Sequence, residues 1–137
     1  MSDHNNNLGR FFEDYTLGDI ITHATPRTLT EADASLYISI YPTRFALQSS
    51  AEFARNCGLK DRPLDDLIVF HTVFGKTVPD ISINAVANLG YAEGTFSNMV
   101  FSGDTLSVTS EIIGLKQNSS GKTGIVYVKT KGQNSSG

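Results

Sequence analysis

A single histidine lies in the middle of the most apolar run of the chain. His71 falls within DDLIVFHTVFGKTVPD, residues 65–80. Because an imidazole exchanges protons near neutral pH, this side chain could act as an acid or base, or contact a substrate. The alternative is a core histidine with one ring nitrogen donating and the other accepting. The flanking apolar residues favour that alternative, so we expect His71 to be buried.

Arg44 is a second candidate, in the stretch YPTRFALQSS, residues 41–50. An arginine beside a predicted helix could bind a substrate carboxylate or phosphate through two parallel hydrogen bonds. A solvated loop arginine fits the same pattern equally well. FGKT at residues 74–77 is not a phosphate-binding loop, because position 70 is Phe70 where the motif needs glycine. The three histidines lack metal-ligand spacing, so no metal site is expected.

The composition is that of one globular domain. The chain has 137 residues and a formal net charge of −3 without a Lys/Arg stripe, so neither nucleic acid nor an anionic membrane is an expected partner. No apolar run approaches the roughly 20 residues of a membrane span. The single cysteine excludes an internal disulfide, and no secretory signal opens the sequence, so we expect a cytoplasmic protein. No cofactor is expected.

The positions that could do chemistry depend on three predicted helices. Residues 1–9 are polar and Asn-rich and are expected to be a disordered tail. An extended segment through Ile20 and Ile21 follows, and Thr30 then caps a first helix that stops before Pro42.

A second, short helix has a stronger start signal. Ser49 precedes Glu52 by three residues, as in a capping box, and Gly58 supplies the stop. Cys57 lies at helical spacing from two alanines and is expected in the core or at its boundary rather than as a nucleophile.

The third helix is predicted over residues 67–78, capped by Asp65 or Asp66 and ended by Pro79. Its apolar residues occur on every side, which is typical of a helix buried all round. His71 would lie at its centre.

From residue 85 onward the sequence changes to β-prone runs that predict antiparallel strands. These runs are residues 85–101, 105–116 and 123–131. QNSSG occurs between the last two runs, as a hairpin loop, and again at residues 133–137 with no strand after it. Two similar polar turns would explain the repeat, but a final turn without a strand also suggests a sheet that continues in a longer polypeptide.

The fold class indicated is α+β, and specific motifs narrow it to a hotdog, an antiparallel sheet wrapped around a central helix. FFEDYTLGD, RTLTEAD and FSGDTL resemble, in order, three signatures of the MaoC-like dehydratase family. With RFALQSSAEFARNCGL, VFHTVFGKTVPDIS and ANLGYAEGTF, the chain is similar within that family to the amino-terminal half of the mesaconyl-CoA hydratases, or β-methylmalyl-CoA dehydratases. Such proteins are double hotdogs of more than twice this length. Residues 10–137 are therefore expected to form one MaoC-like hotdog, truncated at its C-terminal end.

The resemblance implies reversible hydration of an enoyl-CoA type thioester, with mesaconyl-CoA and β-methylmalyl-CoA as the expected pair. Many members use an Asp and a His five positions later, and aligning this chain places Thr43 and Gln48 there. Neither residue is a general base near neutral pH. The family's His-Gly step, whose amide helps hold the thioester oxygen, is His71-Thr72 here. The resemblance thus makes His71 and Gln48 catalytic candidates and Thr43 and Thr72 substrate-binding candidates. Arg44 is a further substrate-binding candidate on its own chemistry.

Two other functions stay open. The missing Asp/His pair favours a non-catalytic acyl-CoA binding module if the chain is complete, and composition alone allows a domain that acts only as an assembly partner. The expected partners are an acyl-CoA thioester and either a second hotdog half or further copies of this chain, because an unpaired sheet edge and an uncovered apolar face favour association.

Overall fold

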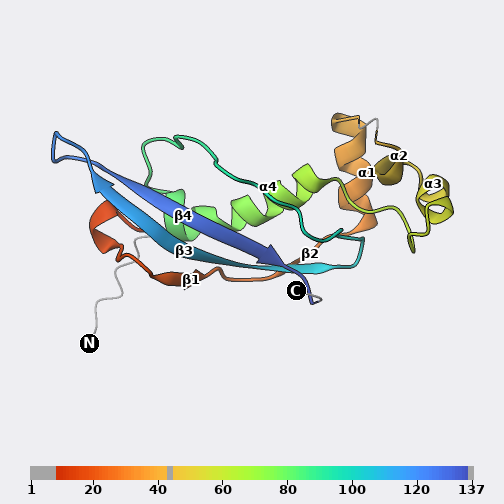
Figure 1. The fold of residues 1–137 in the computed structure, drawn as a ribbon, viewed down its shortest axis with the longest axis horizontal. Coiled ribbons are helices and arrows are strands. Elements are labelled where there is room, and N and C mark those ends of the chain that lie inside the picture. The colour runs from red at the N-terminus through yellow and green to blue at the C-terminus, as the bar shows by residue number, and fades with distance from the viewer. Residues whose placement is uncertain (1–8, 43–44, 136–137) are drawn as a thin grey trace.

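The computed structural model describes residues 9–42 and 45–135, and these form one curved antiparallel sheet with a helix across it (Figure 1). The strands are β1 (Ile20–Thr22), β2 (Arg27–Thr28), β3 (Thr105–Gln117) and β4 (Gly124–Gln133). Strand β3 is the centre: its residues 109–111 pair with both β1 and β4, which therefore lie along its opposite edges. Strand β2 pairs with the start of β3. The β3–β4 hairpin confirms the predicted strands and loop.

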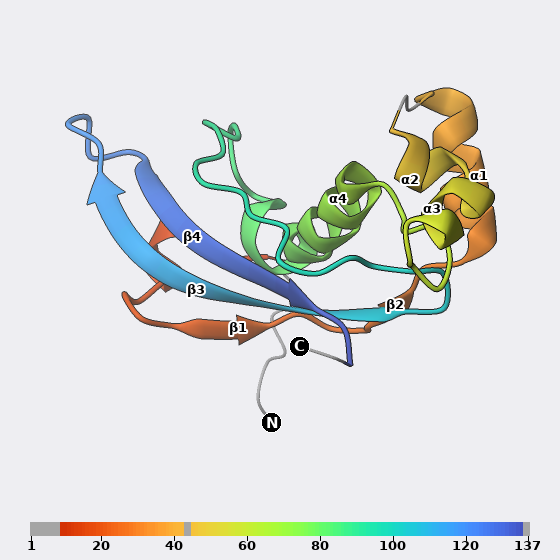
Figure 2. The same cartoon turned by 45° about the vertical axis from the view of Figure 1, so that its right-hand side comes forward.

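Helix α4 (Asp66–Thr77) lies along the concave side of the sheet, and continues into a π-helical turn, Val78–Ser82. Figure 2 shows the sheet curving beneath α4, with α1 (Glu31–Ile40), α2 (Ala46–Ser49) and α3 (Ala51–Asn56) gathered at one end. A short 3-10 helix, Phe12–Asp14, precedes β1. The predicted antiparallel sheet around a central helix is confirmed.

Alternation along β3 builds the core, because successive side chains of a strand point to opposite faces. Leu106, Val108, Ser110 and Ile112 are each at most 1% exposed. Leu106 packs with residues from α1 and from the segment before α4, whereas Ile112 packs with residues of β1 and the start of the chain. The core therefore runs between the sheet and the inner side of α4.

Local signals set most helix ends as the sequence predicts. Thr30 accepts from the Asp33 amide at the start of α1, and Asp65 accepts from the Leu67 amide at the start of α4. Gly58, with a φ of +89°, ends the second helix region. That helix is capped by Ser50 rather than Ser49, since the Ser50 hydroxyl accepts from Phe53. Ser49 instead closes the separate turn α2.

Four expectations about burial and strands are wrong. His71 and Cys57 are exposed, and α4 is covered by the sheet on one side only. The predicted strand at 85–101 is absent: residues 85–99 are exposed and lie outside helices and strands. The backbone enters positive φ at Gly90 and at Glu93, which interrupts the extended conformation that strand pairing needs.

The expected disordered tail, residues 1–9, falls almost wholly outside the described residues. Among the residues that the structure describes, no helix has the length and hydropathy needed to cross a membrane.

Candidate active site

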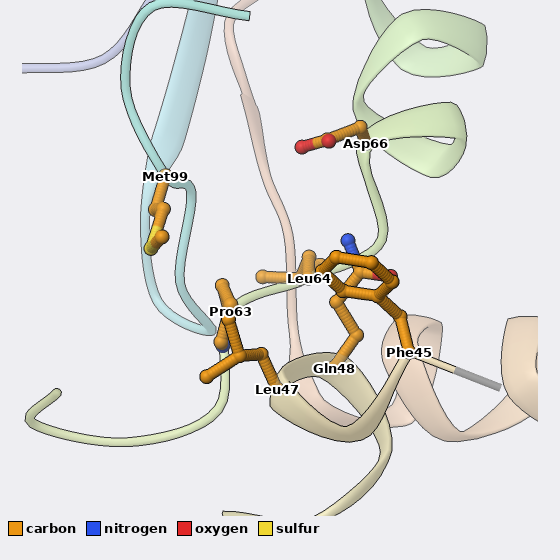
Figure 3. A pocket seen from close by; sticks show the side chains of 7 residues that line it. All are labelled: Phe45, Leu47, Gln48, Pro63, Leu64, Asp66 and Met99. Carbon is orange, nitrogen blue, oxygen red and sulfur yellow. The ribbon is translucent and has the colours of Figure 1, made fainter. Parts of the chain in front are cut away.

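Two hollows lie on either side of the first turn of α4. The smaller, of about 90 Å³, is lined by residues of α2, the segment before α4, α4 itself and the loop before β3: Phe45, Leu47, Gln48, Pro63, Leu64, Asp66 and Met99 (Figure 3). We call it the α2–α4 pocket. The larger is an open groove of about 420 Å³ between the end of α1 and the start of α4, lined by Tyr37, Ile40, Tyr41, Pro42, Asp65 and Leu67. We call it the α1–α4 groove.

The α2–α4 pocket combines apolar walls with one amide and one carboxyl group. Gln48 is the third residue of α2, and Asp66 is the first of α4. Figure 3 shows the Gln48 side chain beside the apolar residues Phe45 and Leu64, with the Asp66 side chain apart from them on α4. An amide both donates and accepts and a carboxylate accepts, so the pocket can bind a polar group of a ligand between them.

The carboxyl of Asp66 is the group of this pocket whose titration is shifted. Its pKa lies above the usual aspartate value because burial disfavours the charged form and because the neighbouring Asp65 carboxylate repels it. A raised carboxyl pKa is a property of many acid/base residues, although structural carboxylates can share it. Sequence reasoning treated Asp66 only as an alternative cap and missed its place in the pocket.

His71 lies on the outer side of α4, outside the residues that line either hollow. Its ring centroid is 5.7 Å from that of Phe70 and 6.4 Å from that of Tyr37, which lines the α1–α4 groove. Phe70, Phe74 and Tyr91 form a neighbouring aromatic cluster, with Tyr91 edge-on to both phenylalanines. The imidazole is therefore accessible to solvent, whereas the sequence predicted a buried histidine.

Thr72, another predicted site residue, does not line the α2–α4 pocket with Gln48. Thr72 is 7% exposed and its hydroxyl donates to the Ile68 carbonyl at 2.8 Å, within the same helix. The Thr72 hydroxyl therefore donates its hydrogen bond within α4. Thr43 and Arg44 lie outside the described residues.

Sequence reasoning also missed a buried polar network on the opposite end of α4. His23 bonds Asp80 at 2.7 Å through Nδ1 and Ser110 at 2.8 Å through Nε2. This order of Asp, His and Ser resembles that of a serine hydrolase, but Ser110 is 1% exposed and no substrate can reach its oxygen. The network is therefore a structural one.

The electrostatics of the two hollows disfavour an anionic ligand group. Asp65 and Asp66 face one hollow each, and among the described residues that line them none is basic. A neutral thioester or amide fits these walls better than a phosphate or a carboxylate. Within residues 9–42 and 45–135, no group of three or more His, Cys, Asp or Glu side chains could hold a metal ion.

A comparison with known families decides where this chain belongs. The family model described as mesaconyl-CoA hydratase matches residues 3–137. The chain belongs to the mesaconyl-CoA hydratase family. It is 62% identical over 128 residues to the beta-methylmalyl-CoA dehydratase of Chloroflexus aurantiacus, and 60% identical over 131 residues to the mesaconyl-CoA hydratase of Cereibacter sphaeroides.

These alignments cover 93% and 96% of this chain but only 36% and 38% of the two relatives. This member of the mesaconyl-CoA hydratase family therefore spans less than two fifths of the length of those curated proteins.

Solved structures confirm the hotdog fold. A MaoC domain protein dehydratase from Chloroflexus aurantiacus matches with a TM-score of 0.91 and 59% identity, over 98% of this chain and 38% of that one. A Mycobacterium tuberculosis protein described as having a double hotdog fold matches with a TM-score of 0.84 at 23% identity, over 93% of this chain and 40% of its own. The chain has the extent of one half of a double hotdog.

Proposed function

We propose that the chain is the amino-terminal hotdog of an enzyme that reversibly hydrates mesaconyl-CoA to β-methylmalyl-CoA. The observation that carries this proposal is the 60–62% identity, over nearly the whole chain, to proteins named for the two directions of that reaction. The α2–α4 pocket supports it, because its largely apolar walls and its amide and carboxyl groups suit the neutral part of an acyl thioester.

Hydration of an enoyl thioester needs two kinds of group. One acid/base group takes a proton from water as the hydroxyl adds to the β-carbon and a proton reaches the α-carbon, and hydrogen-bond donors stabilise the enolate oxygen. In our proposal the Gln48 amide donates to the thioester oxygen, and Asp66 holds the water or an amide of the substrate. His71 remains a proposed contact, since its exposed ring could meet substrate held against α4.

We further propose that the strongest acid/base group is supplied by another hotdog. Gln48 stands where many relatives are expected to carry a catalytic histidine, and an amide does not titrate. The partner would be the second half of a longer polypeptide or a further copy of this chain. Its binding would cover the exposed apolar side chains around α4 and the segment before β3, such as Leu67 at 53%, Val86 at 92% and Leu89 at 73% exposed.

The test is to purify the chain alone and together with the remaining segment of a relative, and to follow the absorbance of mesaconyl-CoA. Activity is expected only in the combined sample, since a positioned acid or base contributes typically 10² to 10⁴ in rate. Robust turnover by the chain alone would refute the division of labour, and would make Asp66 and His71 the leading catalytic candidates.

A non-catalytic acyl-CoA binding module is the second candidate function. It is favoured by the amide at position 48, which cannot act as a general base. It predicts that the chain binds mesaconyl-CoA in calorimetry while neither sample hydrates it. Light scattering separates the third possibility, an assembly partner: association without any thioester binding would support it.

A further inference from the structure

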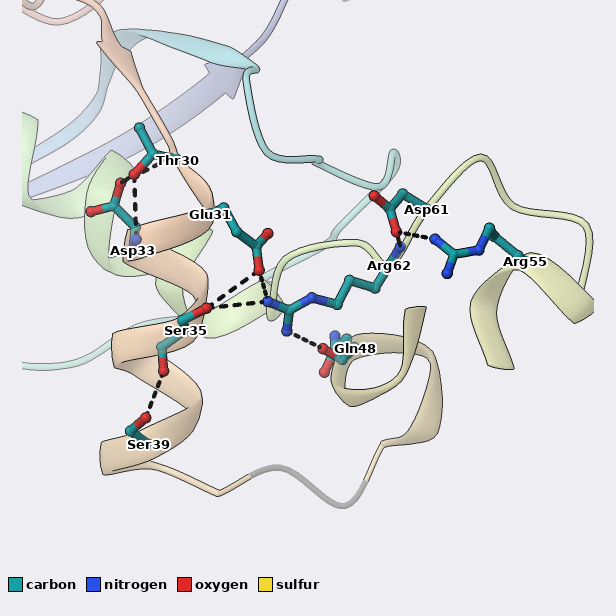
Figure 4. A network of polar contacts seen from close by, with 9 residues as sticks. All are labelled: Thr30, Glu31, Asp33, Ser35, Ser39, Gln48, Arg55, Asp61 and Arg62. Atoms are coloured by element: carbon teal, nitrogen blue, oxygen red, sulfur yellow. Dashed lines mark hydrogen bonds and ion pairs between the residues drawn. The ribbon is translucent and has the colours of Figure 1, made fainter. Parts of the chain in front are cut away.

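One arginine connects the elements that form the α2–α4 pocket. The Arg62 side chain is only 16% exposed, and its guanidinium reaches two helices (Figure 4). One terminal nitrogen donates to Glu31 and, at 3.4 Å, to Ser35, both on α1. The other donates to the main-chain carbonyl of Gln48 in α2 at 3.3 Å. A single rigid fork therefore joins α1 and α2 to the segment that leads into α4.

Helix α2 depends on such outside contacts for its position. It has four residues, and none of them is buried. So short a helix is unstable alone, and its last carbonyls have no partner within the helix. Arg62 supplies a charged donor to one of those carbonyls, which also offsets the negative end of the helix dipole.

The residue that receives this bond is the one that carries the pocket's amide. The opposite wall, Pro63, Leu64 and Asp66, begins one residue after Arg62. A bond from Arg62 to the Gln48 carbonyl therefore limits the separation between Gln48 and Asp66.

The neighbouring Arg55–Asp61 pair provides a comparison. Its two side chains are 56% and 59% exposed and meet at 3.2 Å on the surface. Exposed pairs of this kind contribute little to stability. Arg55 and Arg62 thus have the same chemistry, while Arg62 alone of these two reaches the pocket-forming helix α2.

We propose that Arg62 is a positioning residue, which by bonding Glu31 and the Gln48 carbonyl together holds Gln48 opposite Asp66 in the geometry that binds the thioester. The inference rests on the proposed function for its ligand, but the positioning itself can be tested without one.

The first experiment measures millisecond hydrogen exchange of the amides in residues 46–50. Arg62→Met should speed exchange there by about tenfold, since a charge-assisted bond is lost. Arg62→Lys should have an intermediate effect, because an ammonium group keeps the charge but not the two-directional fork. Arg55→Met is the matched control and should leave these amides unchanged. Equal exchange in wild type and Arg62→Met would overturn the proposal.

The second experiment measures the Kd for mesaconyl-CoA by calorimetry, well below the melting temperature of each variant. Arg62→Met should bind about tenfold more weakly than wild type, and Arg55→Met within about twofold. Val108→Ala, which removes core volume in β3 away from the pocket, controls for general destabilisation and should also bind within about twofold. A loss in Val108→Ala equal to that in Arg62→Met would reduce Arg62 to a structural role.

The two readouts separate this inference from the proposed function. Failure of the wild-type chain to bind mesaconyl-CoA would count against the function, while the exchange experiment would still decide the role of Arg62.

Discussion

The imidazole of His23 lies between Asp80 and Ser110, 2.7 Å from the carboxylate through Nδ1 and 2.8 Å from the hydroxyl through Nε2. The His23 side chain is fully buried. Ser110 is also 2.8 Å from the Thr130 hydroxyl on β4. One ring thus connects the end of β1, the π-helical turn after α4, and the two long strands. The His23 ring therefore holds the C-terminal end of α4 against the sheet.

Replacing this histidine by an apolar residue should destabilise the fold. In His23→Leu the Ser110 hydroxyl keeps Thr130, and the Asp80 carboxylate, which is 36% exposed, can turn to water. The expected cost is therefore that of two lost hydrogen bonds, roughly 1 to 3 kcal/mol. Urea unfolding at pH 7 gives the free energy of unfolding. The exposed Arg55→Met variant serves as the control, with a change below about 0.5 kcal/mol. A His23→Leu protein as stable as wild type would show that the network contributes nothing.

The contact between β4 and α4 is expected to tolerate no side chain at Gly132. A Cβ there would lie 2.3 Å from Val73 Cγ2, so β4 or α4 would have to shift. Gly132→Ala should lower the free energy of unfolding by about 1 to 3 kcal/mol. Gly75→Ala is the matched control: a Cβ at Gly75 meets no atom within 4 Å, and alanine favours the helix by about 0.5 to 1 kcal/mol. In thermal unfolding, Gly132→Ala should lower the melting temperature and Gly75→Ala should raise it.

The start of α1 should contribute a pH-dependent stability. The pKa of Asp33 is lowered by hydrogen bonds from the Thr30 hydroxyl and Thr30 amide, with a smaller contribution from Arg27. A lowered folded-state pKa stabilises the fold above the unfolded value of about 4, and that stabilisation disappears as the pH falls through the folded value. Asp33→Asn should therefore cost about 0.5 to 1 kcal/mol at pH 7 and less at pH 2.5. Urea titrations at both pH values test this, and a constant difference would contradict it.

The sequence predicted correctly those features that depend on contacts within a few residues. Thr30, Asp65 and Gly58 determine helix ends through contacts within a few residues, and the alternation of β3 sets its buried face. Long-range contacts leave no such pattern: His23 is 57 residues from Asp80 and 87 from Ser110, so their network could not be read from spacing.

The same limit explains the misplaced His71. Apolar residues on every side of α4 predict a helix that is buried all round, but the periodicity does not show which elements pack against it. In this chain the sheet covers one side, and His71 lies exposed beside Phe70, which is itself only partly buried. Gln48 was a candidate because the family resemblance pointed to that position, and it lies in the α2–α4 pocket. Asp66 could be found only once α2 and α4 were seen together.

Because His71 is exposed, its replacement should leave the stability of this chain nearly unchanged. His71→Gln is expected to shift the free energy of unfolding by less than about 0.5 kcal/mol. Leu106→Ala, in the core of β3, is the positive control and should cost about 2 to 5 kcal/mol. A large loss in His71→Gln would restore the structural role. In the active, combined enzyme, a tenfold loss of turnover at unchanged melting temperature would instead support contact with the substrate.

Asp66 should show opposite effects on stability and on binding. Its pKa is raised by burial and by Asp65, so the charged form is disfavoured in the folded state, and stability associated with the protonated form is lost as the pH rises through that value. Asp66→Asn removes the charge and keeps the shape, so at pH 7 the free energy of unfolding should stay level or rise. The same variant removes a strong acceptor from the α2–α4 pocket, and should weaken mesaconyl-CoA binding by about tenfold. Glu52→Gln, an exposed acid outside that pocket, is the control for charge alone. If Asp66→Asn bound the thioester as wild type does, the pocket would have to be abandoned as the binding site, whatever its effect on stability.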